Sequence, residues 1–166
     1  MKKIIMIGAL SFVLSGCSLF LSPEEKDVKE KLPSYAEMMQ TSDKLFKNSL
    51  NSVGRGEIDQ TKIAVVSESR LMQEKMVDRL QKDYENPVRN IYITAMHDRL
   101  QSMDTLLRSV QGEEIDVKDV VKLVKEKDEQ MIEEQTKRLN SIVSNYGIDP
   151  IKKINEDICI EECKKK

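Results

Sequence analysis

Apolar side chains recur every three or four residues along most of the chain, and no segment alternates apolar and polar positions as a strand would. Glycine and proline interrupt this pattern at few points, so the segments between them are long. The pattern therefore predicts an all-α fold. The interruptions fall at Pro23, Pro33, Gly54 to Gly56, Pro87, Gly112 and Gly147 to Pro150.

The first predicted helix begins at Pro23, with Ser22 as its capping residue and Pro23 in its first turn. Because proline lacks the N–H that an interior helical position needs, we expect a kink or a restart at Pro33. Asp149 and Pro150 would cap and begin a short last helix. Three further long helices are expected over residues 57–84, 87–111 and 116–146.

Connections of about two to five residues force consecutive helices to lie antiparallel. The predicted fold is an antiparallel up-and-down bundle of about four long helices, with a short N-terminal segment before it and a short C-terminal helix after it. The apolar stripe of the second helix is expected to be Ile58, Val65, Ser69, Met72, Met76 and Leu80.

Methionines fall mainly on the predicted apolar stripes. Soft, adaptable methionine surfaces occur in promiscuous binding proteins, but positions on a stripe favour core filling. We therefore interpret these side chains as part of the core: Met39, Met72, Met76, Met96, Met103 and Met131.

Two charged residues interrupt the stripes. Asp128 falls within the apolar arc of the fourth helix, and Arg99 lies at the edge of the third helix's stripe. Each is about fourteen residues from a turn at residues 113–114, so the sequence predicts that Arg99 and Asp128 pair near the seam of this hairpin. The favoured interpretation is a polar pair that sets the register, and ligand recognition is the alternative.

The amino terminus follows a different pattern. Lys2 and Lys3 precede an apolar and small-residue run from Ile4 to Leu14. Its length of roughly 11 residues is typical of an export signal, because a membrane-spanning helix needs about 20. The four residues Leu14-Ser15-Gly16-Cys17 follow and resemble the lipobox of bacterial lipoproteins.

The resemblance implies that Cys17 carries a thioether-linked diacylglycerol and, after cleavage before Cys17, an N-acyl chain. Residues 1–16 would be the lipoprotein signal peptide, 17–22 the lipidated N-terminus and a short tether, and 23–166 the helical bundle domain. Several buried acyl chains hold a protein on a membrane far more firmly than one.

The predicted location is therefore the extracytoplasmic side of the cell envelope. Ser18, which follows the lipobox cysteine, favours the outer membrane in a host with two membranes; in a host with one membrane the anchor would lie in the cell membrane. Without residues 1–16, which hold two lysines and no acid, the chain has 25 basic and 29 acidic side chains and a net charge of −4. This mildly acidic balance does not indicate nucleic-acid binding.

Few residues suggest catalysis. His97 is the single histidine of the chain and is expected to face water. Neither a metal site nor a cofactor beyond the covalent lipid on Cys17 is predicted, and the protein is not expected to be an enzyme.

Cys159 and Cys163 are four residues apart, which would place both thiols on one side of a helix with Cα atoms about 6 Å apart. Export to an oxidising compartment favours a disulfide within the chain. A bond between two chains and two free thiols remain alternatives. The oligomeric state is open.

The tether of residues 18–22 reaches at most about 18 Å, so the bundle is expected to sit close to its membrane. This favours a non-enzymatic binding or scaffolding module whose partner is another envelope protein, in addition to the lipid membrane itself. The alternative is a structural envelope spacer or a lipoprotein joined to the cell wall. The terminal Lys166 is loosely similar in place to the last lysine of Braun-type lipoproteins, which is linked to peptidoglycan.

Overall fold

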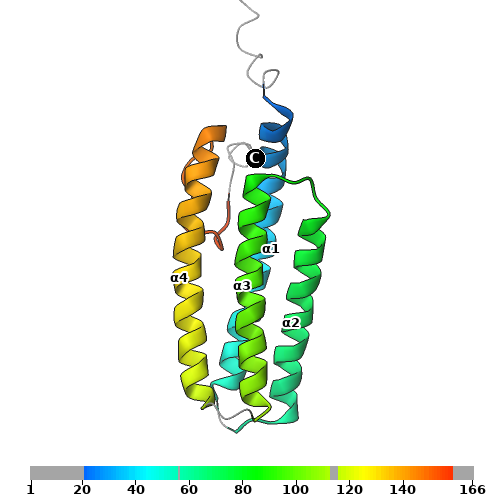
Figure 1. The fold of residues 1–166 in the computed structure, drawn as a ribbon, viewed down its shortest axis with the longest axis vertical. Helices are drawn as coiled ribbons and strands as arrows, with labels where there is room; N and C mark the ends of the chain where they lie inside the picture. The colour runs from blue at the N-terminus through cyan, green and yellow to red at the C-terminus, as the bar shows by residue number, and fades with distance from the viewer. Residues whose placement is uncertain (1–20, 56, 113–115, 159–166) are drawn as a thin grey trace, which may run out of the picture.

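The computed structural model describes residues 21–55, 57–112 and 116–158. These residues form four long helices aligned along one axis, and the described part of the chain contains no strand. Consecutive helices run in opposite directions (Figure 1), which confirms the predicted all-α bundle. The elements are α1 (Pro23–Val53), α2 (Gln60–Gln81), α3 (Pro87–Val110), α4 (Val117–Val143) and a single 3₁₀ turn, η1 (Ser144–Tyr146).

Each long helix begins at a polar capping residue whose side chain accepts a backbone N–H of the first turn. Ser22 accepts from Glu25 at 3.1 Å, as the sequence predicted for the start of α1. Such a bond satisfies a donor that has no partner within the helix. The other capping residues are Asp59 for α2, Asn86 for α3 and Asp116 for α4.

The restart expected at Pro33 does not occur, because α1 is one helix of 31 residues with Pro33 inside it. Proline removes one backbone hydrogen bond but not the apolar face of the helix. Leu32 and Tyr35 are buried on either side of Pro33, and their packing against the core holds the helix together across the missing bond.

The predicted short C-terminal helix is also wrong. Gly147 adopts a left-handed conformation, with φ of 64°, and residues 148–158 follow as a segment without regular structure. The Asn140 side chain donates to the carbonyl of Ile151 at 2.8 Å and accepts from its N–H at 2.7 Å. Thr136 Oγ1 accepts from the N–H of Ile154 at 3.0 Å. Because α4 side chains satisfy these backbone groups, the segment needs no helix of its own.

This C-terminal segment (residues 148–158) lies between α1 and α4. It is bound to α4 through Asn140, and Asn155 reaches Asp43 on α1. α1 packs against both α2 and α3, and α4 packs mainly against α3. The contact between α1 and α4 is small, and the C-terminal segment bridges the two helices through its hydrogen bonds to both.

The core consists of two apolar clusters. The first includes Leu32, Tyr35 and Tyr92 together with Ile151 and Ile154 of the C-terminal segment. The second lies further toward the end of α1. Its buried members are Phe46, Val53, Val66, Met103, Leu106, Val110, Val120 and Val124.

The stripe predicted for α2 is partly wrong. Met72 is 51 % exposed, whereas its neighbour Gln73 is fully buried, and Val66 and Val77 are buried in place of Val65 and Met76. Consequently Met72 does not fill the core and Met76 does so only in part. Met39, Met96, Met103 and Met131 are buried as predicted.

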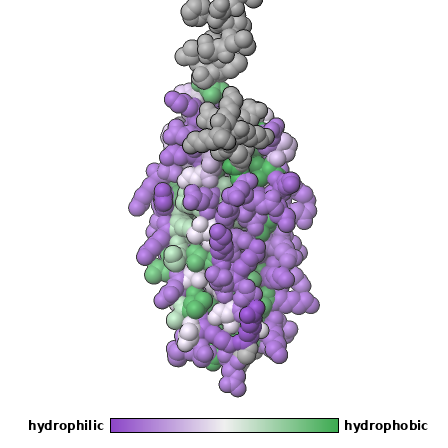
Figure 2. Space-filling model, turned by 180° about the vertical axis from the view of Figure 1, so that it is seen from behind, coloured by the Kyte–Doolittle hydropathy of each residue, from purple (hydrophilic) through white to green (hydrophobic). Residues whose placement is uncertain are grey.

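None of the helices in the described ranges is long and apolar enough to cross a membrane. The face opposite to that of Figure 1 is largely hydrophilic, with separate hydrophobic patches between the polar side chains (Figure 2).

Candidate functional site

Arg99 lies on α3 in the middle of the bundle and is 1 % exposed. Its Nε donates to Oδ1 of Asp128 at 2.6 Å and its Nη2 to Oδ2 of the same carboxylate at 3.1 Å. This two-point contact between α3 and α4 confirms the predicted pair. Such a fork fixes the relative orientation of the two planar groups as well as their distance.

A second carboxylate on the same arginine was missed by the sequence analysis. Asp43 of α1 accepts from Arg99 Nη2 at 2.8 Å, and Arg99 Nη1 donates to Ser42 Oγ at 3.2 Å and to the Met39 carbonyl at 3.4 Å. The available signal was that Ser42 and Asp43 follow Met39, which was assigned to the core, by three and four positions and so fall on the same side of the helix. That signal is weak, because nothing in the sequence indicates how α1 is aligned with α3.

Asp43 has two further partners. Lys47 Nζ lies 2.6 Å from its Oδ2, and Asn155 Nδ2 of the C-terminal segment donates to its Oδ1 at 3.0 Å. Burial by itself would raise the pKa of Asp43, but the hydrogen bond from Lys47, the charge of Arg99 and the hydrogen bond from Asn155 outweigh it. The pKa of Asp43 is therefore below its ordinary value, and the group is ionised at neutral pH.

Gln73 brings α2 into the same cluster. Its Oε1 accepts from Ser42 Oγ at 2.8 Å, and its Nε2 lies 3.5 Å from the sulfur of Met103. We call the five buried residues of this cluster the polar layer. They come from all four helices and are Ser42, Asp43, Gln73, Arg99 and Asp128.

The polar layer is internally satisfied around Arg99. A guanidinium has five N–H donors, and the contacts to Asp128, Asp43, Ser42 and the Met39 carbonyl are sufficient to occupy them. The guanidinium carbon also lies 5.5 Å from the centre of the Phe46 ring. The arrangement therefore suits alignment of the helices, and Arg99 has no donor left for a ligand.

A groove of about 710 Å³ adjoins the polar layer and is lined by α1, α4 and the C-terminal segment. Its apolar lining consists of Leu50 of α1 and Ile132 of α4, which are partly exposed, and of the buried Phe46, and Asp128 and Asn155 border it. Five lysines line it. They are Lys47 on α1, Lys125 and Lys137 on α4, and Lys152 and Lys153 on the C-terminal segment.

The charges around this groove are partly compensated. Lys47 is paired with Asp43, and Lys137 lies 2.6 Å from Glu133. Among the lining acids of the described ranges, Glu129 is the one without a paired cation. Within the same ranges, no carboxylate is within ion-pair distance of the three remaining lysines. These lysines are Lys125, Lys152 and Lys153.

The other candidate residues lie elsewhere. His97 is exposed on α3, as predicted. Cys17, Cys159, Cys163 and Lys166 fall outside the described residues, so their lipidation, disulfide and cell-wall predictions remain predictions. In the described ranges, His, Cys, Asp and Glu side chains form no group of three or more that could hold a metal ion.

Comparison with known proteins adds no family to this picture. No protein-family model matches the sequence, and neither the curated proteins nor the solved structures gave a significant match to it.

Proposed function

We propose that the protein is a lipid-anchored, non-enzymatic binding module of the bacterial cell envelope that docks another envelope protein. The observation that carries this proposal is the short distance along the chain between the lipobox and the bundle. Residues 18–22 separate Cys17 from the first turn of α1 at Pro23. Five residues reach at most about 18 Å, so an anchored bundle stays beside its membrane and meets proteins of that membrane.

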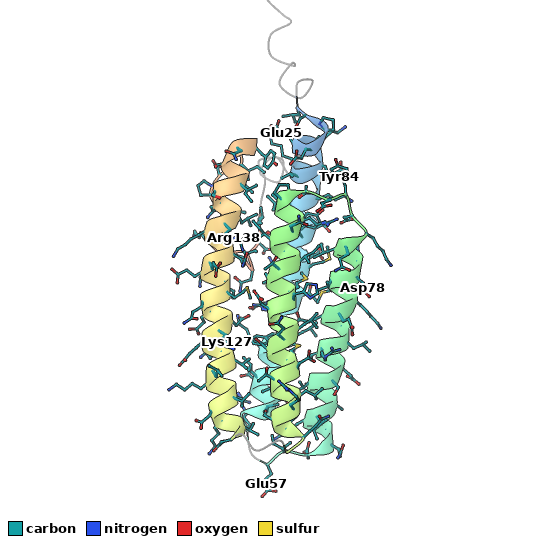
Figure 3. The ribbon with its side chains drawn as sticks, viewed as in Figure 1. Glu25, Glu57, Asp78, Tyr84, Lys127 and Arg138 are labelled. Atoms are coloured by element: carbon teal, nitrogen blue, oxygen red, sulfur yellow. The ribbon has the colours of Figure 1, made fainter. Side chains whose placement is uncertain are left out.

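The anchor would also set the orientation of the bundle. Glu25, near the start of α1, and Tyr84, between α2 and α3, lie at one end of the molecule, and Glu57 lies at the other end (Figure 3). The end that holds Tyr84 would face the lipid. Tyr84 is strongly exposed, and a tyrosine combines an apolar ring with a hydroxyl that suits a membrane–water interface.

Docking requires an apolar surface that the bundle itself does not bury. Leu71 and Met72 are adjacent on α2 and are 49 % and 51 % exposed. α2 has no extensive contact with α4 and lies at the side of the bundle away from it (Figure 1). We call Leu71 and Met72 the α2 face, and we propose that it receives an apolar helix surface of the partner.

Photo-crosslinking in intact cells tests this function. A photoreactive residue at Lys75, which is exposed on α2 close to the α2 face, should give a discrete crosslinked protein. That product should disappear with Leu71→Glu/Met72→Glu and with Cys17→Ser, because the first pair removes the apolar surface and the second removes the anchor. The matched control is Leu123→Glu, since Leu123 is 48 % exposed and belongs to α4, which lies across α3 from α2 (Figure 1).

The control should keep the crosslinked product at its wild-type level. A product that survives Leu71→Glu/Met72→Glu would place the partner elsewhere, and a product unchanged by Cys17→Ser would remove the anchor from the proposal. If lysozyme treatment released a species linked through Lys166, the chain would act as a cell-wall link instead.

A further inference from the structure

We propose that the groove between α1 and α4 binds a single-chain amphiphile with an anionic headgroup. This site is separate from the α2 face and does not depend on the lipid anchor, because α1, α4 and the C-terminal segment form it. The ligand class follows from three properties of the groove: its size, its apolar surface and its unpaired lysines.

The size of the groove suits a small molecule. Its volume of about 710 Å³ is within the range of about 300–1,000 Å³ that is usual for small-molecule sites. Along α4 the lining extends from Lys125 to Lys137, which corresponds to about 18 Å at 1.5 Å per residue. A long, half-open space of this kind accommodates an extended chain better than a compact ring.

The apolar surface of the groove would receive the hydrocarbon. Leu50 of α1 and Ile132 of α4 are partly exposed and come from both sides, and the buried ring of Phe46 lies beneath them. Phe46 belongs to the buried core, and Leu50 packs against the same cluster, so the groove is continuous with the apolar interior. Burial of a hydrocarbon chain gains about 0.8 kcal/mol for each methylene removed from water.

The lysines determine the charge of the headgroup. Lys152 and Lys153 lie together on the C-terminal segment, and neither has a carboxylate partner in the part of the chain that the structure describes. Asn140 and Thr136 hold the backbone of this segment on either side of the two lysines. Their position is therefore fixed by α4, and a carboxylate or phosphate headgroup would supply the missing countercharge.

Isothermal titration calorimetry tests the proposal with four probes, each kept below the concentration at which it forms micelles. The full-length chain carries Cys17→Ser, so that no attached lipid competes for the groove. Dodecanoate and dodecyl phosphate should bind, whereas dodecyl maltoside and inorganic phosphate should bind at least about tenfold more weakly. If dodecanoate binds more tightly, the natural ligand is of the fatty-acid class. If dodecyl phosphate binds more tightly, the natural ligand derives from a phospholipid.

Two matched variants localise the binding. Lys152→Ala/Lys153→Ala should weaken the binding of dodecanoate by about tenfold or more, because two charge-assisted contacts are lost. Lys75→Ala/Lys82→Ala removes the same charge from exposed positions on the α2 side and should leave the affinity within about twofold. Circular dichroism would verify that both variants stay helical.

Three results would overturn the proposal. The first is that neither anionic amphiphile binds. The second is that the two lysine variants lose affinity to the same extent, which would indicate a general effect of charge. The third is that dodecyl maltoside or inorganic phosphate binds as tightly as dodecyl phosphate, since the site would then recognise only the chain or only the anion.

Discussion

At the scale of single residues, Arg99 is the most constrained side chain of the polar layer. Removing a full charge from water costs several kcal/mol, and two buried carboxylates, a hydroxyl and a carbonyl compensate for it here. Such a network adds little net stability compared with apolar residues of the same volume. Removing only one member of the network lowers the stability strongly, because an unpaired charge then remains buried.

Arg99→Met should therefore lower the free energy of unfolding by about 3–5 kcal/mol, since Asp128 and Asp43 lose their shared cation. The double variant Arg99→Met/Asp128→Leu should recover most of this loss, because Lys47 and Asn155 still pair with Asp43. Urea denaturation followed by circular dichroism measures both. Lys137→Met, at an exposed ion pair, is the control and should change little. An Arg99→Met variant as stable as the wild type would contradict this account of the polar layer.

Asp43 makes the stability of the fold depend on pH in the acid range. Its pKa is lower in the folded state than in the unfolded chain, where an aspartate titrates near about 3.9. The stabilisation by its ionised form is therefore complete above about pH 4 and is lost as the pH falls through the lowered pKa. The urea concentration at the midpoint of unfolding should decrease as the pH is lowered past about 4. In Asp43→Asn this decrease should be smaller. A wild-type curve that stays flat from pH 5 to about pH 2 would argue against the lowered pKa.

The residues of the polar layer differ in how far the sequence could predict them. Arg99 and Asp128 lie on consecutive helices at equal distances from one turn, so hairpin geometry sufficed to pair them. Asp43 contacts Arg99 across 56 residues of sequence and Asn155 across 112. Their contacts depend on how α1 and the C-terminal segment pack, which periodicity does not specify.

At the scale of elements, helix identity followed from apolar periodicity and capping residues, but the rotation of α2 did not. The spacing of apolar residues placed Met72 in the core, whereas Gln73 is buried there because Ser42 supplies its hydrogen-bond partner. One position corresponds to a rotation of about 100°. The C-terminal segment could not be predicted for a related reason, since side chains of another element satisfy its backbone.

Asn140→Ala tests how the C-terminal segment is held. The variant removes both hydrogen bonds to the backbone of Ile151, and a buried backbone group left without a partner costs about 1–3 kcal/mol. We expect faster hydrogen exchange at the amides of Ile151 and Ile154 and a lower free energy of unfolding by that amount. Asn145→Ala, at an exposed position of η1, should leave both unchanged. Unaltered exchange in Asn140→Ala would mean that the segment is held by its apolar contacts alone.

At the scale of the whole molecule, the bundle offers two separate surfaces. The α2 face and the groove share no residue, because the first belongs to α2 and the second is formed by α1, α4 and the C-terminal segment. A bundle anchored at the start of α1 could therefore dock a partner through α2 while the groove holds a small ligand. Both proposed activities take place at the membrane surface only if Cys17 carries lipid.

The lipid on Cys17 is tested most directly by mass spectrometry. The protein is purified from the cell envelope, and the mass of its amino-terminal peptide is measured. The account predicts a peptide that begins at Cys17, lacks residues 1–16, and carries the mass of a diacylglyceryl group, with an N-acyl chain where the host adds one. The Cys17→Ser variant should keep its signal segment and carry no lipid mass. An unmodified Cys17 in the wild-type protein, or a mature chain that begins at another residue, would contradict it.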